Sequence, residues 1–226
     1  MNYFILYILL ANAFIMLCYL THNADKAKSE RIQDVLFAEG DVAVLLLKQR
    51  QGVMILTMTI LSFLFLGNKE TVFLAFMINE PWQILLPLLS LTAITLILMS
   101  SKTPLTLAHK TNERLNSRQL SQFFFGRICF IILYEFFFRG LLLFSIAAAT
   151  GIYISVMINL LLYCFIHRHF TKTEIAGVAI FGTIQCIMTV VNHSVWPAVL
   201  LHLSITLAVE MKLLFHKNKQ LNLTTA

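Results

Sequence analysis

The chain has 226 residues, of which 58% are hydrophobic and only 12% are charged. Soluble domains contain roughly 45–50% apolar and about 25% charged residues, so this composition excludes a soluble globule. The 17 Lys and Arg residues against 11 Asp and Glu give a formal net charge of +6, which we interpret as loop charge that orients membrane helices, and nucleic-acid binding is not expected. The four cysteines lie inside apolar runs and are interpreted as small buried hydrophobic residues rather than a disulfide or zinc framework.

Apolar runs predict the membrane spans, each of which needs about 20 mostly apolar residues. The sequence predicts about seven of them, and therefore an all-α, polytopic helix bundle in a lipid bilayer. We expect spans at 3–20, 52–67, 82–100, within 120–149, 151–167, 174–192 and 195–212. The first run lacks a basic leading segment, so we interpret it as a retained anchor and not a cleaved signal peptide. Residues 21–51 are either a solvated inner loop or a membrane-surface helix.

Lysine and arginine in the loops predict the orientation of the chain. With the N-terminus outside and the C-terminus in the cytoplasm, fourteen of the 17 Lys and Arg residues fall on the inner side, and only Lys69 falls on the outer side. This distribution requires one crossing over 127–149, so 119–126 is expected in the inner interface. The predicted organisation is N-terminal membrane helices with charged inner loops over 1–118, a helical core over 119–215, and a polar tail over 216–226.

Glu135 and Arg139 are charged residues inside a predicted span. Ionisable side chains are costly there unless they are paired or hydrated, so they mark a functional site or a structural pair. The two residues are four apart, and a helix therefore places them on one face, where they can form an ion pair. The pair is consistent with a structural link between helices or with a functional site.

Two further spans carry polar residues at helical spacing. Tyr163 and His167 share a face near the inner end of the fifth span, where a histidine is often an interfacial residue. A polar stripe runs along the last span and consists of His202, Thr206 and Glu210. It is consistent with a catalytic site or with an interhelical hydrogen-bonded seam. Both spans therefore contribute candidate site residues, with a structural alternative for each.

Glu135, His167 and His202 are predicted at similar depth in the inner half of the bilayer, counted from the nearest basic residues at about 1.5 Å per residue. A carboxylate and two imidazoles can activate a water molecule and stabilise an oxyanion. The same three side chains are a candidate zinc set, although no HExxH spacing supports it. Gln185, in the sixth span, is interpreted as an interhelical hydrogen-bonding residue.

Three motifs carry a resemblance to a known family. YEFFFR at 134–139, YCFIH at 163–167 and HLSIT at 202–206 resemble the EExxxR, FxxxH and HxxxN or HxxxD motifs of the CAAX protease and bacteriocin-processing family of intramembrane endopeptidases. The resemblance covers roughly 120–210. Tyr134 stands where that family has its first Glu, Tyr163 replaces Phe, and Thr206 replaces Asn or Asp.

The resemblance implies a CAAX-protease-like core over 119–215 and hydrolysis of a membrane-associated peptide or protein substrate. It further implies a multi-pass protein of a bacterial inner membrane. In the roles that it implies, Glu135 is the base and Arg139 orients it, His167 positions the water, and His202 and Thr206 stabilise the oxyanion. A metallopeptidase-like variant would use a divalent metal such as zinc.

Tyr134 leaves the enzymatic prediction open, because the residue that the family uses to activate water is absent. The alternative is a non-catalytic membrane scaffold of the same fold that serves as an immunity, peptide-binding or assembly factor. A small transporter is a third hypothesis, but the sequence shows no paired discontinuous helices.

Overall fold

The computed structural model describes residues 116–167 and 171–224, together with positions 81, 82, 85, 89, 90 and 93. The predicted spans at 3–20 and 52–67 lie outside the described residues, and only scattered positions of the span at 82–100 are described. From residue 116 onward every described element is helical, which confirms the all-α class.

The first described element is a long, continuous helix in three parts. α6 (Ser117–Glu135) begins at a capping box formed by Asn116, continues into the π-helical segment η1 (Phe136–Leu142), and ends as α7 (Leu143–Thr150). Gly151 then adopts φ +88°, a left-handed conformation that glycine accepts without steric cost and that turns the chain back. The predicted interfacial segment 119–126 is thus helical and continuous with the span that follows.

Three more helices complete the described bundle. α8 (Ile152–Ile166) returns from Gly151, and α9 (Lys172–Asn192) begins at a second capping box, in which Thr171 is the cap. His193 ends α9 in the left-handed conformation, with φ 49°, and α10 (Trp196–Thr224) follows.

α10 is longer than the predicted span at 195–212 and includes most of the tail predicted at 216–226. The physical reason is that no Gly or Pro occurs between Pro197 and Thr224, so nothing in the sequence stops the helix.

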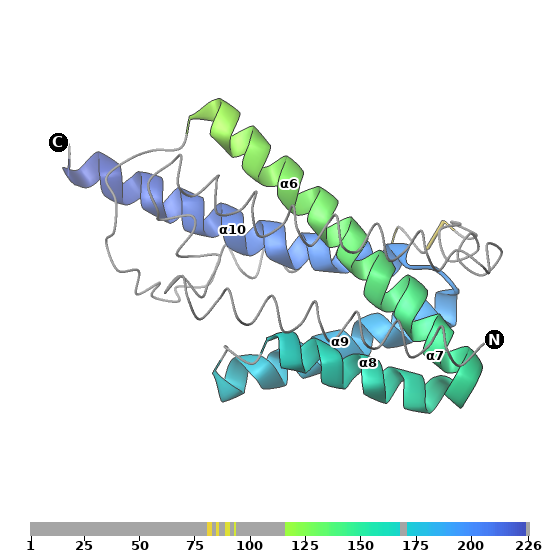
Figure 1. Cartoon of the computed structure of the whole chain (residues 1–226). Helices are drawn as coiled ribbons and strands as arrows, with labels where there is room; N and C mark the ends of the chain where they lie inside the picture. Colours follow the sequence, from red (N-terminus) through yellow and green to blue (C-terminus); the bar gives the residue numbers. More distant parts are fainter. Residues whose placement is uncertain are drawn as a thin grey trace.

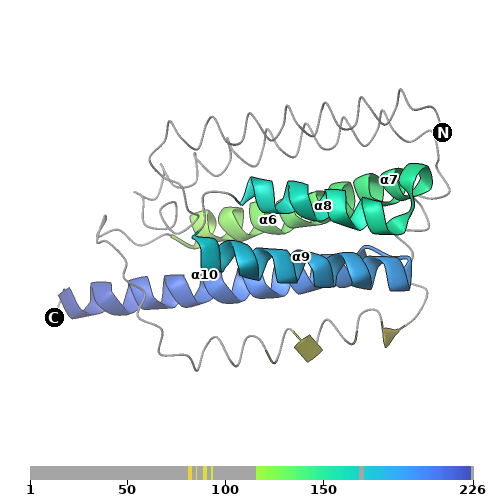
Figure 2. The ribbon, with the colours of Figure 1, turned by 90° about the horizontal axis from the view of Figure 1, so that it is seen from below.

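The helices form two layers (Figures 1 and 2). α8 and α9 lie side by side in one layer, and α6 and α10 form the other. The start of α6, the end of α8, the start of α9 and the C-terminal end of α10 lie at one end of the bundle. The predicted topology requires this grouping, because it assigns these helix ends to the same side of the membrane.

Three described helices are long and apolar enough to cross a membrane: Ser117–Thr150, Glu174–Asn192 and Trp196–Phe215. Ile152–Ile166 is apolar but shorter. The 34-residue helix is about 51 Å long at 1.5 Å per residue, which exceeds a hydrocarbon core of about 30 Å. The protein is therefore an integral membrane protein.

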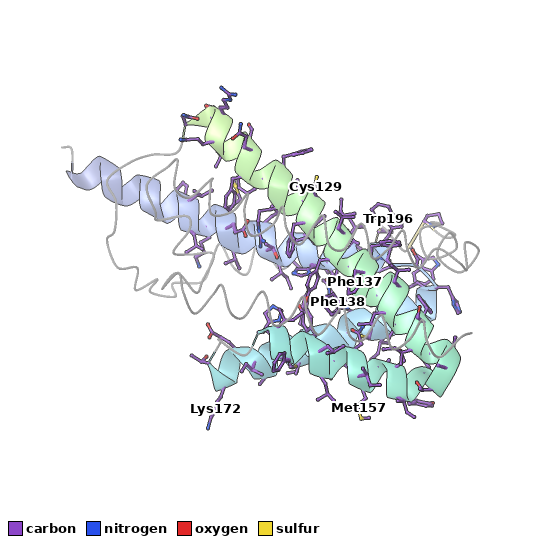
Figure 3. All side chains as sticks on the ribbon, in the orientation of Figure 1. Cys129, Phe137, Phe138, Met157, Lys172 and Trp196 are labelled. Carbon is purple, nitrogen blue, oxygen red and sulfur yellow. The ribbon has the colours of Figure 1, made fainter. Side chains whose placement is uncertain are left out.

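The core lies between the two layers. Phe137 and Phe138 project from η1 into this region (Figure 3) and pack with aromatic and aliphatic side chains of α6, α7 and α8. Large apolar side chains on the other faces of α8 and α9 are exposed, as expected for surfaces in contact with lipid. They are Tyr153, Ile154, Met157, Leu161, Phe165, Ile180, Ile184, Ile187 and Val191.

Candidate functional site

Four side chains from α6, η1, α9 and α10 form a polar group in the core, which we call the Glu135 cluster: Glu135, Arg139, Gln185 and His202. The Oε1 atom of Glu135 accepts hydrogen bonds from His202 Nδ1 at 2.5 Å and from Gln185 Nε2 at 3.1 Å. Its Oε2 atom lies 3.3 Å from Arg139 Nε. Gln185 Oε1 in turn accepts from Arg139 Nη2 at 2.9 Å, so one amide bridges the acid and the guanidinium.

The π-helical segment η1 carries Arg139 and is held by α8. Leu143 N–H donates to Phe138 O, five residues earlier, which is π-helical spacing. Asn159 Nδ2 donates to the same Phe138 O at 2.7 Å, and Ser155 Oγ donates to Leu143 O. The two α8 side chains are four residues apart, whereas the carbonyls that they bind are five apart. α8 thus satisfies the carbonyls of a widened turn, a feature that recurs at functional sites.

Tyr163 and His167 extend the site from α8. The Arg139 guanidinium lies 4.4 Å from the centre of the Tyr163 ring, a cation–π contact of about 2 kcal/mol when it is desolvated. His167 ends α8, and its ring centre lies 4.7 Å from that of Tyr163. His167 Nδ1 donates to Tyr163 O at 2.8 Å. His167 is therefore connected to the Glu135 cluster through the Tyr163 side chain.

The hydrogen bonds of the two imidazoles determine which nitrogen carries the proton. Tyr163 O is a carbonyl and Glu135 is a carboxylate paired with Arg139, so both act as acceptors, and Nδ1 is protonated in His167 and in His202. In a neutral imidazole, Nε2 then carries the lone pair. The His202 side chain is 17% exposed and the Glu135 side chain 0%, so within this pair the imidazole is the group that a reactant can reach.

Tyr134 fills the space beside His202. Its ring centre lies 5.8 Å from His202, 4.6 Å from Phe138 and 6.2 Å from Tyr163. Both the ring and its hydroxyl are buried. An aromatic side chain thus stands beside the imidazole at the position where the resembling motif has its first glutamate.

The predicted site residues are placed as follows. Glu135, Arg139 and His202 are in contact, and the predicted ion pair between residues four apart is present. Thr206 lies one turn beyond His202 on α10 and is half-buried. The interpretation of Gln185 as an interhelical hydrogen-bonding residue is confirmed. No sequence motif reveals that Gln185 lies between the acid and the guanidinium.

The candidate zinc set does not fit this geometry. Within 116–167 and 171–224, no three His, Cys, Asp or Glu side chains come together as metal ligands. Glu135 cannot serve as the third ligand beside His167 and His202, because its Oε1 is bound by His202 and Gln185 and its Oε2 faces Arg139.

Gly182 lets Tyr163 pack closely against α9. A Cβ atom at Gly182 would lie 2.8 Å from Tyr163 Cδ1 and 3.2 Å from Leu160 Cδ1. Gly177, on the same helix, is a matched control, because a Cβ atom there would meet no neighbour within 4 Å among the described residues. The close approach at Gly182 therefore bears directly on the ring that covers Arg139.

We expect Gly182→Ala to lower the free energy of unfolding by about 1–3 kcal/mol, because the methyl group must displace the Tyr163 ring. Gly177→Ala is expected to be neutral or stabilising by up to about 1 kcal/mol, since alanine favours the helix and the site is open. Unfolding of both variants in mixed micelles measures the difference. Equal stabilities would contradict the tight contact.

Comparison with known families identifies the segment that contains this site. Residues 116–208 match the family model described as type II CAAX prenyl endopeptidase Rce1-like. Comparisons with curated proteins and with solved structures found no match. The matched segment contains all three motifs, and the resemblance to CAAX proteases is confirmed over these residues.

Proposed function

Because residues 116–208 match the type II CAAX prenyl endopeptidase Rce1-like family, we propose that the chain is an intramembrane endopeptidase of the CAAX type. Its substrate is a membrane-associated peptide or protein. The contact that carries the proposal is the hydrogen bond between Glu135 and His202, at 2.5 Å, inside a helix bundle of membrane-spanning length.

In this proposal His202 is the general base. The Glu135 carboxylate accepts the Nδ1 proton, keeps Nε2 as the basic nitrogen and stabilises the imidazolium that forms. Glu135 itself is a poor base in this arrangement, because it is fully buried and its oxygens face His202, Gln185 and Arg139. His202 therefore takes the role of base that the family resemblance implies for Glu135, and Glu135 orients His202 instead.

Hydrolysis then follows general base and general acid steps. His202 Nε2 takes a proton from water as the water oxygen attacks the scissile carbonyl carbon, and the carbonyl oxygen becomes an oxyanion. His202 returns the proton to the amide nitrogen as the C–N bond breaks, which yields a carboxylic acid and an amine. His167 orients the water through its Nε2 lone pair, and the Thr206 hydroxyl donates to the oxyanion.

The test uses the purified full chain in lipid vesicles with membrane-anchored peptides as probes: one with a prenylated C-terminus and one with a hydrophobic leader. We expect the wild type to cleave one probe, and His202→Ala to cleave it about 10²–10⁴-fold more slowly, as measured by mass spectrometry. His193→Asn is the matched control, because His193 is exposed, lies outside the site and has a left-handed backbone that asparagine tolerates. Equal rates for wild type and His202→Ala would refute the proposed role.

Tyr134 favours a second function, a scaffold that binds a hydrophobic peptide without cleaving it. Its buried ring occupies the place beside His202 where the family motif has a carboxylate. In the same vesicle experiment, a scaffold would bind a probe and leave it intact, and Tyr134→Glu would begin to cleave it. Cleavage by the wild type would exclude this second function.

We further propose the orientation that the loop charges predict, with the C-terminus in the cytoplasm of a bacterial cell and the Glu135 cluster in the inner half of the membrane. The support is that the start of α6, the end of α8, the start of α9 and the end of α10 lie together at one end of the bundle.

A further inference from the structure

A second buried polar contact joins α6 to α10 outside the Glu135 cluster. Arg127 Nε lies 2.8 Å from Glu210 Oε1, and the two residues are 6% and 2% exposed. The proposed hydrolysis does not use either residue. The pair nevertheless joins the same two helices that carry Glu135 and His202.

The two contacts belong to one register of the antiparallel helices. Arg127 precedes Glu135 by eight residues on α6, and Glu210 follows His202 by eight residues on α10. Eight residues rise about 12 Å on an α-helix. Both contacts therefore form at the same axial position of α10 along α6. Sliding α10 along its axis would break both of them.

A shift of α10 by one turn would leave both α6 residues without a polar partner of the right kind. A shift in one direction would place Thr206 opposite Arg127 and Ala198 opposite Glu135. A shift in the other direction would place Leu214 opposite Arg127 and Thr206 opposite Glu135. None of these side chains is a carboxylate or an imidazole. A buried charge left without its partner is strongly destabilising, so the shifted registers are disfavoured.

The remaining buried surface of α10 discriminates weakly between registers, since lipid provides no hydrophobic force between helices and the side chains are small or aliphatic. These residues are Pro197, Ala198, Val199, Leu201, Ser204, Ala208 and Leu213. A buried ion pair is often no more stable than apolar side chains of similar volume, but polar pairs can specify register.

We propose that Arg127 and Glu210 are positioning residues that set the register of α10 against α6 and so bring His202 to Glu135. The consequence for hydrolysis rests on the proposed function, but the register itself does not.

Disulfide crosslinking measures the register without a substrate. Ile131 and Thr206 lie midway between the two contacts, four residues from each. Ile131→Cys and Thr206→Cys are introduced together, with the native cysteines replaced by alanine, and the rate of disulfide formation is followed in membranes. The comparison variants are Arg127→Met/Glu210→Met, which removes both charges at similar volume, and the charge exchange Arg127→Glu/Glu210→Arg.

We expect the methionine pair to keep its melting temperature within a few degrees while crosslinking at least about tenfold more slowly, and the charge exchange to restore the rate. Crosslinking of the folded methionine pair at the parental rate would overturn the proposal. A charge-exchange variant that fails to crosslink would also overturn the proposal. This second comparison keeps the test decisive if the methionine pair does not fold. Normal crosslinking in the cysteine variant, together with a wild-type chain that keeps Thr206 and hydrolyses no probe, would count against the proposed function alone.

Discussion

Arg139→Met is expected to lower the free energy of unfolding by about 3–5 kcal/mol, because it leaves the Glu135 carboxylate buried without its cationic partner. The substitution also removes the hydrogen bond to Gln185 and the contact with the Tyr163 ring. Such a loss is a large share of the roughly 5–15 kcal/mol that stabilises a typical domain. Unfolding in mixed micelles measures it.

The double variant Glu135→Leu/Arg139→Met is the control for charge burial. Replacing both members of a buried ion pair with apolar residues is often close to neutral, so we expect most of the lost stability to return. If Arg139→Met lowers the free energy of unfolding by less than about 1 kcal/mol, the buried Glu135 carboxylate does not depend on Arg139 for its stability. The double-mutant cycle then measures how strongly the two residues are coupled.

Glu135→Gln is expected to lower kcat about 10²–10⁴-fold with a much smaller change in KM, if the chain hydrolyses peptides as proposed. The glutamine amide can donate to His202 Nδ1, which moves the imidazole proton to Nε2 and removes the basic nitrogen. The neutral amide also no longer stabilises an imidazolium. Single-turnover kinetics in vesicles with the cleaved probe separates binding from chemistry.

Glu135→Asp is the matched variant for that experiment, because it keeps an acceptor-only carboxylate and shortens only its reach. We expect it to retain more activity than Glu135→Gln. If Glu135→Gln cleaves at the wild-type rate, Glu135 does not act through His202, and another residue must be the base. Melting curves of both variants distinguish a chemical defect from loss of the folded state.

Local patterns in the sequence predict much of the fold and part of the site. Apolar runs of span length predict the helices from 120 to 212, because span length and hydropathy are properties of the sequence itself. The pairing of Glu135 with Arg139 is predictable for the same reason, since residues four apart meet on one helix. The order of the three motifs is sufficient to predict the family that residues 116–208 match.

Other features depend on contacts between residues distant in the sequence. The π-turn at Phe138 is matched by hydrogen bonds from Ser155 and Asn159, two side chains of the next helix. Gln185 reaches the acid and the guanidinium from α9, and no local spacing signals it. A glycine that accommodates the Tyr163 ring is likewise indistinguishable from any other helical glycine until its neighbour is known.

The sequence alone therefore determined the membrane class, the helices and the ion pair within one helix, because each depends on residues a few positions apart. Tertiary packing decided the rest: that His202 binds Glu135, that Glu210 binds Arg127 in the same register, and that an amide from α9 joins acid to guanidinium. These contacts join side chains that are 46 to 83 residues apart, so they exist only once the helices have packed.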